Sequence, residues 1–163
     1  MKKRKTSHAR RKSQGKPANR QTAKTSSAEQ QRPRLGLKAT VERIVEHQHT
    51  IQSLNPALPA VLSTPSMIGL MEHATVAAVL RDLPEGVITV GTRIEVDHLK
   101  AVPPGAKVEA SAHFVEYRGR FLVFDVEARS GEHVIGRGRV FRAMVEPASH
   151  GEKAKSRVKN PTA

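Results

Sequence analysis

The segment between residues 63 and 82 constrains the fold most, because it reads as a helix that is apolar nearly all round. Ser63-Thr64-Pro65 places a hydroxyl residue before a proline, which is typical of a helix start and makes Thr64 the predicted N-cap. The helix should run to about Asp82. Between Met67 and Leu80, the residues other than Ala, Val, Ile, Leu and Met are Gly69, Glu72, His73 and Thr75. Such a helix belongs in the middle of a domain, surrounded by other elements.

Strand patterns precede and follow this helix. Residues 38–46 alternate between apolar and polar side chains, which predicts a half-buried strand. Two prolines in the segment 50–62 predict a connection or a short lid. From Gly86 onward the sequence predicts four strands in meander, separated by turns that contain Pro or Gly: residues 87–99, 107–117, 121–128 and 133–145.

This order of elements predicts one α+β domain over residues 37–147. One long helix should be wrapped by a curved antiparallel sheet of about five strands, with short connections. The free face and the edges of such a sheet need cover, which favours a homodimer or a higher oligomer.

The formal charge of +13 lies almost entirely outside this domain. Residues 1–34 hold 12 Lys and Arg against one acid, residues 148–163 hold 4 against one, and residues 35–147 hold 12 against 13. We expect residues 1–36 and 148–163 to be disordered basic tails, because they are too polar to form a core. The nearly neutral domain gives no reason to expect nucleic acid as its substrate. A weak contact of the N-terminal tail with nucleic acid or another anionic surface stays open.

The composition also excludes several kinds of site. A chain without cysteine has no disulfide framework, no thiolate metal site and no cysteine nucleophile. His47 and His49 alternate on one predicted strand face but lack a third convincing ligand, so neither a metal nor a cofactor is expected. We find no apolar run of the ~20 residues that span a membrane, and no leader pattern. These observations predict a soluble, cytoplasmic protein without a membrane partner.

Two polar residues stand out within the predicted apolar interior. Glu72 projects between the directions of Ile68 and Val76, inside the apolar surface of the helix. A carboxylate there is paired with a backbone group or an Arg, is protonated, or opens onto a pocket. Counting by twos along its strand, His98 also points inward, where a lone His is either a satisfied core residue or a functional one. On facing elements, Glu72 and His98 would make an acid and base pair.

The third candidate is Thr64, whose simplest role is to cap the helix. Free backbone N–H groups and the helix dipole at this end favour an anion or a developing oxyanion. A hydroxyl there can also act as a nucleophile or orient a water, provided that a His lies within reach.

Several stretches of the sequence, taken together, carry a resemblance to a known family. They are Ser63-Thr64-Pro65-Ser66-Met67-Ile68-Gly69-Leu70-Met71-Glu72, Thr89-Val90-Gly91-Thr92 and Val96-Asp97-His98-Leu99-Lys100-Ala101-Val102-Pro103-Pro104-Gly105, together with Gly119-Arg120 and Ile135-Gly136-Arg137-Gly138. These stretches closely resemble the fluoroacetyl-CoA thioesterase family of the hot-dog fold. The similarity covers about residues 40–145.

The resemblance implies a fold, an activity and a site. It implies a hot-dog dimer with acyl-CoA sites near the subunit interface. It places Thr64, Glu72 and His98 on the catalytic residues of the family, and Gly91 on a glycine whose backbone lies at the thioester carbonyl. The chain departs from the family pattern at Val140, where many relatives have a His. It also departs at residues 55–62, which lack the Phe side chains of the fluoroacetate-specific lid.

We therefore expect hydrolysis of a small acyl-CoA thioester without selectivity for a fluorinated acyl group. The alternatives are a non-catalytic acyl-CoA-binding hot-dog module and a nucleic-acid-associated protein that acts through its basic tail. A hydratase is disfavoured, because the sequence has no Asp-x-Asn-Pro-x-His segment.

Overall fold

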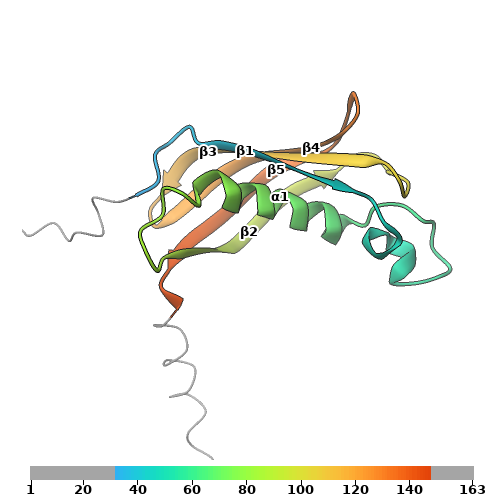
Figure 1. Cartoon of the computed structure of the whole chain (residues 1–163), viewed down its shortest axis with the longest axis horizontal. Helices are drawn as coiled ribbons and strands as arrows, with labels where there is room; N and C mark the ends of the chain where they lie inside the picture. The colour runs from blue at the N-terminus through green and yellow to red at the C-terminus, as the bar shows by residue number, and fades with distance from the viewer. Residues whose placement is uncertain (1–31, 148–163) are drawn as a thin grey trace, which may run out of the picture.

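The structure is a computed structural model that describes residues 32–147, so the predicted tails lie outside the described residues except for residues 32–36. One helix packs against one five-stranded antiparallel sheet, which confirms the expected fold class (Figure 1). The elements in chain order are β1 (Lys38–Ile44), the short 3-10 helices η2 (His47–His49) and η3 (Ile51–Ser53), α1 (Thr64–Val79), β2 (Ile88–His98), β3 (Lys107–Arg118), β4 (Phe121–Ser130) and β5 (His133–Val145).

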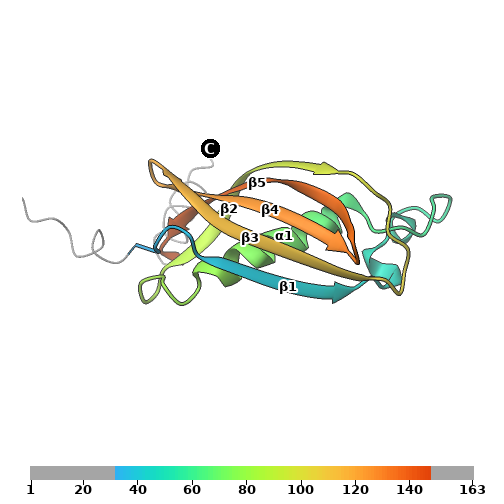
Figure 2. The ribbon, with the colours of Figure 1, turned by 90° about the horizontal axis from the view of Figure 1, so that it is seen from above.

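The order of strands in the sheet corrects one prediction. Strands β3, β4 and β5 form the expected meander, but β2 pairs with β5 rather than with its neighbour in sequence, β3 (Figure 2). The spatial order is β1-β3-β4-β5-β2. Strands β1 and β2 are therefore the two edges, and the segment between β2 and β3 crosses from one side of the sheet to the other. Strand β2 runs back along α1 after the connection at residues 80–87, so His98, at the end of β2, lies close to the start of the helix.

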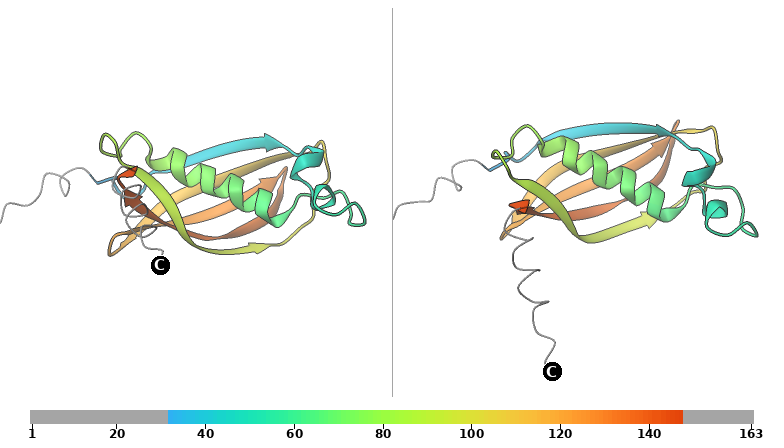
Figure 3. Two further views of the ribbon diagram at one scale, coloured as in Figure 1. Left: turned by 90° about the horizontal axis from the view of Figure 1, so that it is seen from below. Right: turned by 60° about the horizontal axis from the view of Figure 1, so that its bottom comes forward.

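Helix α1 lies across the concave face of the sheet, as the views in Figure 3 show. Its buried residues Met67, Leu70, Met71 and Ala74 form the core together with strand residues such as Phe114 and Phe124. The helix packs mainly against β1 and β3, and the inner face of the edge strand β2 is less covered, since Ile94 is 40% exposed. The outward side of the helix keeps an exposed row at Pro65, Gly69, His73, Ala77 and Leu80.

The start of the helix differs from the prediction by one residue. Ser63, not Thr64, is the N-cap: it is extended, with φ −77° and ψ 149°, and its hydroxyl accepts a hydrogen bond from the Ser66 N–H at 3.3 Å. Thr64 is the first helical residue. The capping is done by its neighbour, so the Thr64 hydroxyl is free for another partner. The helix ends at Val79 rather than near Asp82.

The segment between β1 and α1, residues 45–63, is held in place by backbone hydrogen bonds, and we call it the strap. His47 and His49 lie in η2 and not, as predicted, on the face of a strand. Thr50 and Leu62 form an isolated antiparallel bridge, and the Ile51 N–H donates to the Val61 carbonyl at 2.9 Å. These bonds hold the strap across the N-terminal end of α1. In residues 32–147, no helix is long and apolar enough to cross a membrane.

Candidate functional site

Thr64 and His98 form a direct side-chain pair. Thr64 opens α1 and His98 closes β2, and Oγ1 of the one lies 2.9 Å from Nδ1 of the other. His98 reaches the helix because it lies on the inner face of the sheet, as the period of two along β2 predicts. A ring nitrogen at this distance can accept the hydroxyl proton, so the pair can supply an activated hydroxyl.

A glycine on the neighbouring strand makes room for this pair. Gly136 is the register partner of His98, and a Cβ at Gly136 would lie 2.5 Å from the sulfur of Met67. Met67 is fully buried, one turn along the helix from Thr64. A side chain at position 136 would therefore displace Met67 and, with it, the start of the helix that carries the hydroxyl.

The other ring nitrogen of His98 has no partner within the described residues. Nε2 is buried and makes no hydrogen bond to any residue in 32–147. A buried polar atom left without a partner costs roughly 1–3 kcal/mol, and such atoms are uncommon in folded proteins. A further molecule bound at this site would supply the missing hydrogen bond and remove the cost.

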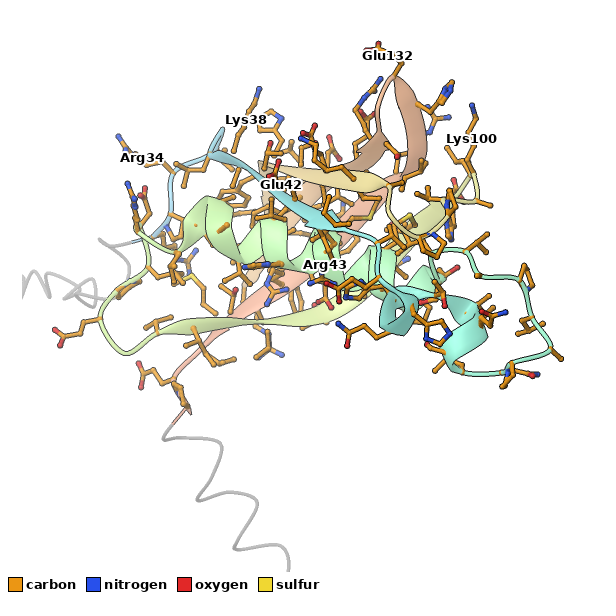
Figure 4. All side chains as sticks on the ribbon, turned by 45° about the vertical axis from the view of Figure 1, so that its right-hand side comes forward. Arg34, Lys38, Glu42, Arg43, Lys100 and Glu132 are labelled. Atoms are coloured by element: carbon orange, nitrogen blue, oxygen red, sulfur yellow. The ribbon has the colours of Figure 1, made fainter. Side chains whose placement is uncertain are left out.

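An open pocket of about 310 Å³ lies beside the pair. Thr64 and His98 line it together with the aliphatic side chains of Ile51, Val61, Leu62 and Leu99. Lys100 stands at its rim, with Nζ 3.3 Å from Nδ1 of His133, and Figure 4 shows Lys100 close to the hairpin whose tip carries Glu132. The hydroxyl thus faces a pocket of mixed character, with aliphatic walls and the polar side chains of Ser63, His98 and Lys100.

Glu72 belongs to a second cluster, farther along the helix. Nη1 of Arg142 donates to Oε1 of Glu72 at 3.1 Å, and this carboxylate is about one third exposed. Gly91 lies directly against it, since a Cβ at residue 91 would overlap Oε1. The Arg partner is one of the alternatives that the sequence left open for Glu72.

Arg142 and Thr89 are residues of this cluster that the sequence analysis missed. Arg142 is only 6% exposed, and besides Glu72 it binds the hydroxyl of Thr89 from Nε at 2.9 Å and the Thr89 carbonyl from Nη2 at 2.8 Å. Burial lowers the pKa of the Arg142 guanidinium, and the Glu72 carboxylate opposes that shift. The guanidinium remains charged, because its ordinary pKa is very high.

The two clusters stand apart within one chain. Eight residues of helix separate Thr64 from Glu72, which is ~12 Å along the axis. No hydrogen bond or ion pair found within residues 32–147 joins Glu72 to His98. The acid and base pair expected from the sequence is therefore not formed inside a single chain. Thr64 and His98 are together, Glu72 and Gly91 are together, and the two pairs face the same side of the sheet.

The structure also shows the surroundings of Val140 and of the side chains that could bind a metal. Val140, where the resemblance implied a departure from the family pattern, is fully buried in the core and packs there. No group of three or more His, Cys, Asp or Glu side chains within the described part of the chain is arranged to hold a metal ion.

The chain is similar in sequence to known thioesterases. The family model described as fluoroacetyl-CoA-specific thioesterase matches residues 45–148. The fluoroacetyl-CoA thioesterase of Streptantibioticus cattleyicolor is 35% identical over 135 residues, which is 79% of this chain and 94% of that protein.

Solved structures agree with the sequence match. A structure of the fluoroacetyl-CoA thioesterase has a TM-score of 0.70 at 34% identity, covering 78% of this chain and 98% of that one. A mutant of that enzyme in complex with acetyl-CoA has a TM-score of 0.71 at 32% identity, covering 77% and 98%. A thioesterase superfamily member from Thermus thermophilus has a TM-score of 0.70 at 27% identity, covering 77% and 96%.

Proposed function

Because the chain belongs to the fluoroacetyl-CoA-specific thioesterase family of acyl-CoA thioester hydrolases, we propose that Thr64, Glu72 and His98 are its catalytic residues and that it acts on small acyl groups. The observation that carries the proposal is the 2.9 Å contact between the Thr64 hydroxyl and the His98 ring, which both line an open pocket. This is the arrangement that nucleophilic or water-mediated acyl transfer needs.

The chemistry follows from this contact. His98 takes the proton from the Thr64 hydroxyl, or from a water that Thr64 orients, while the oxygen forms a bond to the thioester carbonyl carbon. The bond from carbon to sulfur then breaks, and the proton held by His98 returns to the leaving CoA thiolate. In the first route water subsequently hydrolyses the acyl-threonine. Both routes yield the free acid and CoA.

Glu72 and Gly91 complete the site from a second copy of the chain. Strand β2 is an edge strand that exposes the apolar residues Ile88, Val90 and Ile94. The unpaired edge of β2 and the exposed row along α1 are both surfaces that a partner can bury. In a two-fold dimer the same surface of a second chain buries both of them. Gly91 and His98 lie toward opposite ends of β2 (Ile88–His98). Antiparallel pairing of two β2 edges about a two-fold axis brings the part of one strand that holds Gly91 toward the end of the other that holds His98.

In this dimer each part has a role. The Glu72 carboxylate of one subunit faces the Thr64 and His98 pair of the other, where it orients the His or the attacking water. Gly91 lets the thioester approach the backbone, because a side chain at this position would fill the space. In this proposal the second subunit or the substrate supplies the partner that the buried Nε2 of His98 lacks within residues 32–147.

The pocket limits the acyl group. Its walls carry the aliphatic side chains of Ile51, Val61, Leu62 and Leu99, and among the described residues no Phe, Tyr or Trp lines it. Aliphatic walls select by size and apolar contact, and they give one small acyl group little advantage over another of similar shape. We therefore propose a small aliphatic acyl-CoA as the substrate, without selectivity for fluorine.

A free-thiol release assay tests the proposal. Acetyl-, fluoroacetyl-, branched, medium-chain and aromatic acyl-CoA are each supplied to the wild type, Glu72→Gln and His98→Ala. The small aliphatic substrates should release CoA fastest, and both variants should be at least ~100-fold slower, the size expected for loss of a general acid or base. His113→Ala, on the outer face of β3, is the matched control and should keep wild-type rates. Binding of acyl-CoA without CoA release from any of them would show a non-catalytic module instead.

A further inference from the structure

Arg142 is a buried cation that faces the helix from the inner side of the sheet. Among the described residues, the buried polar side chains are Thr50, Ser63, Thr75, Thr89 and Arg142, so Arg142 is the charged member of that set. A buried charge is costly unless it is paired and hydrogen-bonded. Arg142 satisfies this condition with three hydrogen bonds.

Two of these bonds fix the guanidinium plane to β2. Nε donates to the Thr89 hydroxyl at 2.9 Å, and Nη2 donates to the Thr89 carbonyl at 2.8 Å. Arg142 is the register partner of Gly91, so its side chain runs back along β2 to reach Thr89, two residues earlier. A planar fork held at two points has one orientation for its remaining nitrogen.

That remaining nitrogen meets Glu72. Nη1 donates to Oε1 at 3.1 Å, and the same oxygen occupies the space where a side chain at residue 91 would lie. The carboxylate is thus bounded on one side by a guanidinium that cannot turn and on the other by the backbone of Gly91. A Glu side chain has three rotatable torsions, and this arrangement selects one of their conformers.

We infer that Arg142, anchored by Thr89, is a positioning residue that holds the Glu72 carboxylate against Gly91 for the reaction. The inference rests on the proposed function and names a residue that acts through Glu72 without touching the reacting atoms. A lysine at this position would keep the charge, but its single ammonium group cannot hold Thr89 at two points and Glu72 at a third.

Conservative variants separate positioning from charge and from folding. The rate of CoA release is measured with the best acyl-CoA of the panel for Arg142→Lys, Thr89→Val and Thr89→Ser. Loss of positioning should lower kcat of Arg142→Lys at least ~10-fold while KM changes less than ~3-fold, because a transition-state interaction is lost. Thr89→Val should lower kcat, and Thr89→Ser, which keeps the hydroxyl, should restore most of it. Arg139→Lys is the matched control, since Arg139 is on the same strand but in an exposed ion pair with Asp125, and it should be unchanged.

A double-mutant cycle then shows whether Arg142 acts through Glu72. In the Glu72→Gln background, Arg142→Lys should cost less than ~3-fold in kcat, because the carboxylate that it positions is already gone. An equal loss in both backgrounds would show a purely structural role and overturn the inference. So would a folded Arg142→Lys variant with wild-type kcat.

Two further outcomes are decisive. Should Arg142→Lys not fold, the pair Thr89→Val and Thr89→Ser decides: a lower kcat for Val alone supports the inference, and equal rates overturn it. A wild type that releases no CoA from any substrate would end the proposed function, and this inference with it. An active wild type with an unchanged Arg142→Lys would end this inference alone.

Discussion

Oε1 of Glu72 occupies the space that a side chain at Gly91 would need. The two residues come from the helix and from the edge strand of the sheet, so their contact fixes how α1 and β2 sit against each other on the open side of the domain. It also explains a glycine in the middle of a strand, where glycine is otherwise unfavourable.

Gly91→Ala tests this contact. The added methyl group overlaps the carboxylate, so Glu72 must move away from Arg142, and kcat for CoA release should fall at least ~10-fold. The free energy of unfolding, measured by urea denaturation, should change by less than ~1 kcal/mol, because the overlapping atom is the end of a flexible, one-third exposed side chain that can move. A folded Gly91→Ala variant with the kcat of the wild type would contradict a role for this contact.

Ser63 caps the helix and Thr64 contacts His98, and this difference in role gives a second prediction. Ser63→Ala removes the N-cap hydrogen bond and should lower the free energy of unfolding by about 1 kcal/mol. Thr64→Val keeps the shape but removes the hydroxyl that contacts His98, so it should cost far more kcat than stability. Thr64→Ser keeps the hydroxyl and should retain most of the activity. Urea denaturation and CoA release, measured side by side, check all three, and a large loss of stability in Thr64→Val would show that Thr64 is the cap after all.

Tyr117 gives a prediction for alkaline pH. Its hydroxyl donates to the Pro33 carbonyl at 2.8 Å, and burial raises the pKa of Tyr117 above its ordinary value of about 10, opposed by the Arg32 cation. It is the one tyrosine of the chain, so the ultraviolet absorbance of the phenolate reports its titration alone. The midpoint should lie above that of the urea-unfolded protein.

The sign of the effect on stability follows from linkage. Tyr117 ionises at a lower pH in the unfolded chain than in the folded one. Its contribution to the free energy of unfolding is therefore complete below about pH 10 and declines as pH rises through the pKa of the folded state. Tyr117→Phe should remove the part of the alkaline loss in the free energy of unfolding that comes from ionisation of Tyr117. A folded midpoint equal to the unfolded one would refute the burial of this phenol.

The sequence predicted the elements well because their signals are local. The apolar run of α1 and the alternation in the strands are read within ten or fifteen residues. The pairing of β2 is not local. Its pattern shows that it is a strand but not whether β3 or β5 lies beside it, and the predicted meander was wrong for this reason. The N-cap was placed one residue late, because Ser63 and Thr64 are both good capping residues.

The candidate site was predicted in part. Periodicity pointed His98 inward, and the structure brings it to Thr64. It could not say that Glu72 would meet Arg142, although one signal was available: Arg142 lies two residues after the buried Val140, so it shares the inward face of β5. The distance between Thr64 and Glu72 in one chain follows from helix geometry, but the strand pattern does not show which residues of two chains would lie opposite each other.

The central claim is that one thioesterase site is built from Thr64 and His98 of one subunit and Glu72 and Gly91 of the other. His98→Ala and Glu72→Gln, each expected to be at least ~100-fold slower alone, are unfolded together in equal amounts, refolded, and assayed for CoA release, with heterodimers verified by native mass spectrometry. Half of the dimers should be mixed, and each mixed dimer has one site with both residues intact, so activity should return to about one quarter of the wild type. Heterodimers that form but release no CoA would contradict the shared site.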